Sequence, residues 1–143
     1  MSVTLGRNVV ARLIRGIRLA TLWKRSVAYM EKENYQAAKE TLLKLDRTTG
    51  MLHGEKRLLY AVAMFKLGSL EDCAVQIRLA RAEMGRSQFL SRHEINYLNC
   101  YADRIWEKLV HSGLPGVDDE YYGSFAEIDE RRIPNYMRHN FPL

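Results

Sequence analysis

Apolar residues recur at helical spacing along most of this chain, and their periodicity predicts a series of α-helices. The pattern is clearest between residues 20 and 111, where apolar positions return every three or four residues and stop at short polar or glycine-containing stretches. All three prolines come after residue 114, and no long alternation of β-branched residues occurs. We therefore expect an all-α protein.

Two stretches share one helix–turn–helix pattern. The first places a helix over 22–32, a turn at 33–34 and a helix over 35–46; the second places a helix over 57–67, a turn at 68–69 and a helix over 70–80. Equivalent residues are 35 positions apart: Glu33 and Gly68, Tyr35 and Leu70, Ala38 and Cys73, Leu42 and Ile77, Leu45 and Ala80. Tetratricopeptide repeats have a period of about 34 residues.

Residues 20–83 resemble the tetratricopeptide-repeat family in composition as well as in spacing. Small residues stand at the positions where the helices of that family touch: Ser26, Ala61, Ala38 and Cys73. Leu22 and Arg57 depart from the family, which usually has Trp there, and Glu33 stands where the family has Gly. The resemblance implies a solenoid of α-α hairpins with two degenerate repeats.

Further helices are expected on both sides of the repeats. Ser91 and Glu94 have the spacing of a capping box, which would open a long helix. Its apolar stripe consists of Ile95, Leu98, Ala102, Ile105, Trp106 and Leu109. The expected organisation is a single domain over 1–112, with a basic helix over 5–20, repeat one over 20–46, repeat two over 55–84 and a capping helix over 91–111, followed by an acidic and aromatic tail over 113–143.

The net charge of +5 is unevenly distributed. Residues 1–30 contain no acidic residue and six basic ones: Arg7, Arg12, Arg15, Arg18, Lys24 and Arg25. Between residues 5 and 22, apolar and arginine positions each recur at helical spacing, which predicts a basic amphipathic helix. Three interpretations stay open: a helix packed on the end of the repeats, a helix on an anionic membrane, and an organellar targeting segment.

The two cysteines, Cys73 and Cys100, both fall in predicted helices, and we expect buried free thiols. Free thiols favour the cytoplasm or another reducing compartment. The arginine-rich, acid-free N-terminus keeps a mitochondrial location as the alternative.

Convergent catalytic or metal-binding groups are missing from the sequence. The four histidines share no metal-ligand spacing with each other or with a cysteine, and no glycine-rich phosphate loop occurs. We therefore expect a protein that is not an enzyme and needs no metal or cofactor.

The resemblance also implies a concave groove lined by the first helix of each repeat. The corresponding side chains are Trp23, Val27, Met30, Glu31, Leu58, Val62, Phe65 and Lys66. The mostly apolar lining predicts a small adaptor or assembly factor that binds a segment of another protein there. The alternative function is binding of an anionic membrane through the basic N-terminal helix; nucleic acid is disfavoured because no aromatic residues alternate with the arginines.

The tail differs in composition from the rest of the chain. Residues 117–143 carry six acidic residues and three arginines, together with several aromatic residues. Aromatic residues at this density argue against disorder. We expect the tail to fold back, to cover apolar surface with Tyr121, Tyr122 or Phe125, and to be one possible occupant of the groove.

Overall fold

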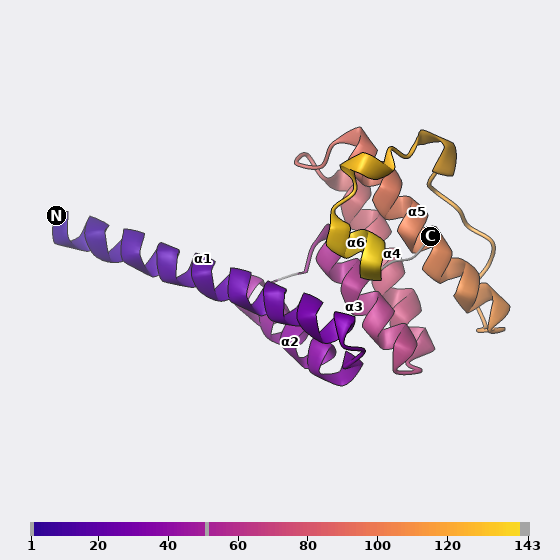
Figure 1. Ribbon diagram of the computed structural model, residues 1–143, viewed down its shortest axis with the longest axis horizontal. Coiled ribbons are helices and arrows are strands. Elements are labelled where there is room, and N and C mark those ends of the chain that lie inside the picture. Colours follow the sequence, from indigo (N-terminus) through magenta and orange to yellow (C-terminus); the bar gives the residue numbers. More distant parts are fainter. Residues whose placement is uncertain (1, 51, 141–143) are drawn as a thin grey trace. The chain divides into compact units, whose positions relative to one another are not determined.

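The computed structural model of this protein describes residues 2–50 and 52–140, and every regular element in those ranges is helical. The elements are α1 (Ser2–Glu31), α2 (Tyr35–Thr49), α3 (Gly54–Lys66), α4 (Leu70–Arg86), α5 (Arg92–His111), the short 3₁₀ helices η1 (Phe125–Glu127) and η2 (Glu130–Arg132), and α6 (Asn135–Asn140). Figure 1 follows them along the chain. Packing divides the chain after Leu52 into two compact units, α1–α2 and α3–α6.

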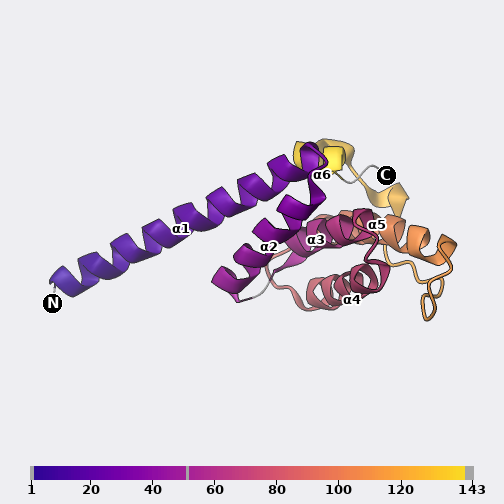
Figure 2. The ribbon, with the colours of Figure 1, turned by 90° about the horizontal axis from the view of Figure 1, so that it is seen from below.

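In the first unit, α1 and α2 form an antiparallel hairpin. Here the structure corrects the sequence analysis: the basic helix over 5–20 and the first repeat helix are one continuous helix of 30 residues. Gly16 does not interrupt the helix, because one glycine costs a helix interior only about 1 kcal/mol relative to alanine. Figure 2 shows α1 as one uninterrupted helix. Since α2 has only 15 residues, the N-terminal half of α1 extends past the end of its partner.

The second helix of this hairpin is slightly longer than predicted. It begins after Asn34, whose side chain accepts a hydrogen bond from the backbone of Ala37, and it continues to Thr49 instead of ending at residue 46. Gly50 then ends it with a left-handed backbone (φ 84°) and donates its N–H to the carbonyl of Asp46. Such a glycine is a common way to satisfy the last carbonyl groups of a helix.

The turns of the two hairpins use the same backbone hydrogen bonds at positions 35 residues apart. The amide of Asn34 donates to the carbonyl of Tyr29 at 2.9 Å, and the amide of Ser69 donates to that of Met64 at the same distance. Glu33 and Gly68 both have a positive φ, 58° and 81°. The two turns therefore share one backbone geometry.

In the second unit, α3, α4 and α5 pack together around one apolar core. The predicted capping box opens α5, with Ser91 and Glu94 each hydrogen-bonded to the backbone of the other. The largest fully buried side chains of this unit are Leu58, Leu59, Met64, Ile77, Met84, Leu98, Tyr101, Trp106, Leu109 and Met137. The predicted stripe of α5 thus faces the core, except for Ile95, which is only half-buried.

The chain after α5 turns back and runs along α5 toward that helix's N-terminal end (Figure 1). This confirms that the tail folds back, but the anchors differ from those expected. Tyr121, Tyr122 and Phe125 remain 52%, 59% and 45% exposed, whereas Ile133 and Met137 are buried. The aliphatic residues near α6 therefore supply the apolar burial, and the aromatic stretch lies on the surface.

Candidate functional site

The eight side chains expected to line a groove differ in exposure. In the first unit, Trp23 and Val27 are half-buried, Met30 is buried and Glu31 is exposed. In the second unit, Leu58 and Val62 are buried, Phe65 is half-buried and Lys66 is exposed. Lys108 places its ammonium nitrogen 5.8 Å from the centre of the Phe65 ring. Met30, Leu58 and Val62 thus pack inside the fold, and the available surface at these positions comes from the remaining five.

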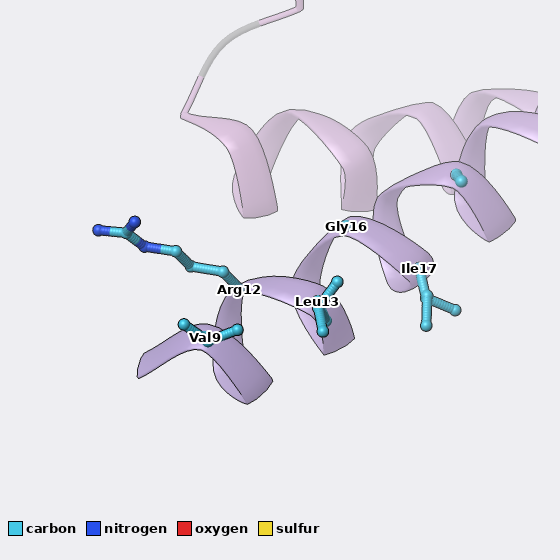
Figure 3. Close-up of a pocket in the computed structure, with 6 residues that line it drawn as sticks. Val9, Arg12, Leu13, Gly16 and Ile17 are labelled. Carbon is cyan, nitrogen blue, oxygen red and sulfur yellow. The ribbon is translucent and has the colours of Figure 1, made fainter. Parts of the chain in front are cut away.

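The largest run of exposed apolar side chains lies instead on the N-terminal half of α1. Its members are between 54% and 67% exposed, and we call them the α1 stripe: Val9, Val10, Leu13, Ile14 and Ile17. Figure 3 shows Val9, Leu13 and Ile17 on successive turns of the helix, with Arg12 and Gly16 between them. Gly6 and Gly16 have open space around them, and each contributes to a shallow hollow along this surface.

The α1 stripe lies on the side of α1 turned away from α2. At about 3.6 residues per turn, the stripe falls within one arc, and Arg7, Arg12, Arg15 and Arg18 occupy the remaining arc. Leu22, Ser26 and Met30, which are buried, continue the arginine arc into the hairpin. Arg15 confirms this orientation, because its guanidinium donates to the carbonyl of Thr48 at 2.8 Å in the last turn of α2.

All six basic residues of the predicted surface are exposed: Arg7, Arg12, Arg15, Arg18, Lys24 and Arg25. Arg15 also stabilises the end of α2, since a cation near a helix C-terminus interacts favourably with its last carbonyl groups. Between Arg7 and Arg18, the first unit therefore presents an apolar strip beside a basic one over about three turns of helix.

A second candidate site lies in the other unit, on α4 and α5, and sequence reasoning missed it. Asp103 is buried in the middle of α5 and forms an ion pair with Arg81 at 2.8 Å. The same carboxylate accepts hydrogen bonds from the backbone amides of Tyr122 and Gly123, at 3.1 and 2.9 Å. A buried carboxylate needs such partners, because leaving it unpaired would be costly.

Three further side chains of α5 form hydrogen bonds with the main chain of the tail. Asn96 accepts from the amide of Ser124 at 2.9 Å and donates to its carbonyl at 3.0 Å. The indole N–H of Trp106 donates to the carbonyl of Asp118, and Nε2 of His93 accepts from the amide of Asp129. These contacts extend over more than three turns of α5, so the tail from Asp118 to Asp129 lies along this helix.

Aromatic side chains of the tail lie against cations of the helices. The guanidinium of Arg81 lies 4.5 Å from the ring centre of Tyr122, and that of Arg104 lies 4.6 Å from that of Phe125. Arg81 also lies 5.0 Å from the ring centre of Trp106. Cation–π contacts of this kind contribute about 0.5–2 kcal/mol each, depending on how far water is excluded.

Burial is the largest cause of the pKa shifts of three groups on α4 and α5. It lowers the pKa of Arg81, while the neighbouring Asp103 acts in the opposite direction. Burial raises the pKa of the Cys100 thiol to about 11 and that of Cys73 to about 12. Both cysteines are buried free thiols, as expected, and they are kept in the unreactive protonated form.

One sequence signal could have pointed to this site. Asp103 directly follows Ala102 and precedes Trp106 by three residues, so it borders the apolar stripe of α5. An aspartate is a poor former of helix interiors, and at a buried position it requires a partner. The sequence alone could not show that the partner would be Arg81 together with two amides of the tail.

Across residues 2–50 and 52–140, no cluster of three or more His, Cys, Asp or Glu side chains has the geometry to hold a metal ion. Within those same ranges, no helix combines the length and the apolar character that crossing a bilayer requires.

Comparison with known proteins leaves the chain without an assigned relative. No family model matches the chain, and neither curated proteins nor solved structures contain a significant match to it.

Proposed function

We propose that this protein is a non-catalytic binding module that attaches to the surface of an anionic membrane through α1. The observation that carries the proposal is the α1 stripe, five exposed apolar side chains in a segment with six cations and no acid. A helix with this division lies flat at a bilayer surface, with the apolar side among the acyl chains and the cations among the headgroups.

We also propose that the two hairpins are tetratricopeptide-like repeats. Support comes from the matching turns, and from matching burial at positions 35 residues apart. Ser26 and Ala61 are fully buried, as are Ala38 and Cys73. Full burial of such small residues is what close approach of two helix backbones requires.

Charge distinguishes an anionic membrane from a second copy of this chain. Pairing two α1 stripes would bring into contact two helices that carry twelve cations and no acidic residue within residues 1–30, in either orientation of the helices. Like charges across an interface are destabilising. An anionic surface reverses the sign of that interaction for every basic residue, so the charge favours a membrane.

Both the basic residues and the apolar side chains of α1 should contribute to the free energy of membrane binding. A basic residue near an anionic leaflet contributes about 1 kcal/mol, an interaction that salt screens. Full burial of a Val, Leu or Ile side chain contributes about 1.5–3 kcal/mol, and salt does not screen it. Binding should therefore weaken at high ionic strength and require both the apolar stripe and the arginines.

Vesicle sedimentation tests this proposal. The full chain should bind vesicles that contain phosphatidylserine and bind vesicles of pure phosphatidylcholine at least tenfold more weakly. Leu13→Glu with Ile17→Glu should abolish binding, and Arg12→Gln with Arg18→Gln should weaken it about fivefold per arginine. Because all four side chains are exposed, these variants should fold.

Matched controls come from the second unit. Val75 and Leu79 on α4 are 47% and 43% exposed, and Val75→Glu with Leu79→Glu should leave vesicle binding unchanged. Arg131→Gln with Arg132→Gln makes the same charge change on exposed residues of η2. Equal losses in the α1 variants and the controls, or equal binding to neutral and anionic vesicles, would show that α1 is not the attachment site.

A protein partner at the predicted groove is the second candidate function. The observation in its favour is that Trp23, Val27 and Phe65 remain only half-buried. Such binding should be almost indifferent to salt and should survive the Leu13→Glu and Ile17→Glu changes. Binding of a protein partner that is lost in Val27→Lys with Phe65→Lys, but kept in Leu13→Glu with Ile17→Glu, would support this second candidate.

A further inference from the structure

The segment from Asp118 to Asp129 is held to the second unit mainly through its backbone. Side chains of α4 and α5 bond the carbonyls of Asp118 and Glu120 and the amides of Tyr122, Gly123 and Ser124. Side-chain-to-backbone bonds along an extended chain are how protein grooves recognise peptides, since the main chain supplies affinity whatever the sequence. Asn96 shows this most clearly, because it pairs with both the amide and the carbonyl of Ser124.

The same surface also selects sequence at one position. A Cβ atom placed on Gly123 would lie 2.5 Å from Sγ of Cys100 and 2.6 Å from the Cys100 backbone nitrogen, and 3.0 Å from the carbonyl oxygen of Asn96. The backbone of α5 cannot move aside for a side chain there, so the site accepts only glycine. Arg81 and Arg104 lie against aromatic rings on either side, those of Tyr122 and Phe125.

The segment makes these contacts without contributing to the apolar core. No residue from Ser112 to Arg132 is buried, and the first buried side chain after α5 is Ile133. Segments with little apolar burial open at a lower free energy than the core does. The site can therefore empty while α3, α4 and α5 remain folded.

We propose that Arg81, Asn96, Asp103 and Trp106 form a peptide-binding site that the chain's own tail occupies, and that it takes in trans an extended peptide with the pattern aromatic–Gly–x–aromatic, where x is any residue. The tail acts as a competing internal ligand. The occupant in trans is the tail of a second copy of this chain, because the segment seen on the site is Tyr122–Phe125 of this same sequence. A segment of another protein with the same pattern is an outcome of the test.

The test displaces the tail from the site by a substitution and then measures binding of a separate peptide with the tail sequence. In the full chain, Gly123→Val removes the tail from the site, and a fluorescent peptide with the sequence of residues 117–130 is the probe. The variant should bind the probe at least tenfold more tightly than the unchanged protein, in which the tail competes. A probe with Val in place of its glycine should not bind.

Two further variants serve as controls. Gly85→Ala adds a methyl group at a glycine on α4 that has open space around it, and it should bind the probe as weakly as the unchanged protein does. Adding Asn96→Ala to Gly123→Val should weaken probe binding at least tenfold. A folded Gly123→Val protein that does not bind the probe, or that binds it no better than the unchanged protein, overturns the proposal.

Amide exchange on the unchanged protein tests the proposal even if Gly123→Val does not fold. The amides of Tyr122, Gly123 and Ser124 should exchange at least tenfold faster than buried amides of α5 near Tyr101. Equal protection would mean that the site empties only when the whole unit unfolds, and the proposal would be wrong.

Mixing two variants tests whether the peptide comes from a second copy of this chain or from another protein. Gly123→Val keeps the site and loses the tail ligand, whereas Asn96→Ala keeps the tail ligand and weakens the site. A one-to-one complex of these two by native mass spectrometry, absent for either alone, supports a second copy. Probe binding without such a complex supports a segment of another protein.

Discussion

Hairpins α1–α2 and α3–α4 make their turns with the same hydrogen bonds, at positions 35 residues apart, yet their first helices have different surroundings. In α3, most residues are buried, and α5 packs against both α3 and α4. In α1, residues 6–18 are all exposed, and five of them are large and apolar. The comparison shows that local sequence shapes a turn, whereas the elements packed beside a helix decide whether its apolar side is core or surface.

A substitution in α5, the helix that packs on α3 and α4, should have the largest effect on the free energy of unfolding. Trp106 on α5 is 1% exposed and its N–H is hydrogen-bonded to the tail, whereas Trp23 on α1 is half-buried. Trp106→Ala should lower the free energy of unfolding by about 3–5 kcal/mol, and Trp23→Ala should lower it by less. Urea denaturation followed by circular dichroism measures both. Equal losses would mean that the buried Trp106 contributes no more to stability than the half-buried Trp23, and the packing of α5 would not distinguish the two units.

The small buried positions test whether the two hairpins pack alike. Ala38 and Cys73 are equivalent, and both are 0% exposed. Ala38→Leu and Cys73→Leu should each lower the free energy of unfolding by about 1–3 kcal/mol, because the larger side chain overpacks a filled space. Thermal denaturation is sufficient to detect this. An unchanged melting temperature in either variant would remove that position from the repeat.

The turn residues should respond with opposite signs. Gly68 has φ 81° and Glu33 has φ 58°, a backbone that costs a residue with a Cβ atom about 1–2 kcal/mol. Gly68→Ala should therefore destabilise the protein by about 1 kcal/mol. Glu33→Gly relieves the same cost but loosens the unfolded chain, so it should be neutral or stabilising by less than about 1 kcal/mol. Chemical denaturation measures both changes in the free energy of unfolding. A destabilisation of about 1 kcal/mol in both variants would contradict this prediction.

The helix caps should show the smallest difference. Asn34 caps α2 with a side-chain hydrogen bond, whereas Ser69, its equivalent at α4, makes no such bond. Asn34→Ala should cost about 1 kcal/mol and Ser69→Ala only a few tenths. Ser91→Ala, which removes the capping box of α5, provides a positive control of about 1 kcal/mol. A loss for Ser69→Ala as large as that for Asn34→Ala would contradict the structural difference between the caps.

Much of the helical framework was predictable because it depends on neighbours in the chain. Apolar periodicity places the helices, and the 35-residue repeat places both turns. The capping box at Ser91 and the burial of Ala38 and Cys73 were predicted correctly for the same reason. The continuity of α1 was missed because the repeat resemblance placed a boundary at residue 20, although no capping or breaking residue near that position marks the start of a separate helix.

The sequence by itself thus determined where this chain turns, which faces of its helices are apolar, and that all of its early charges are basic. Only the tertiary structure decided which apolar face stays in water, and that Asp103 and Arg81 meet Gly123 of the tail. The physical reason is distance along the chain. Asp103 meets partners about twenty residues away on both sides, and no local period encodes which acid will be buried against which amide.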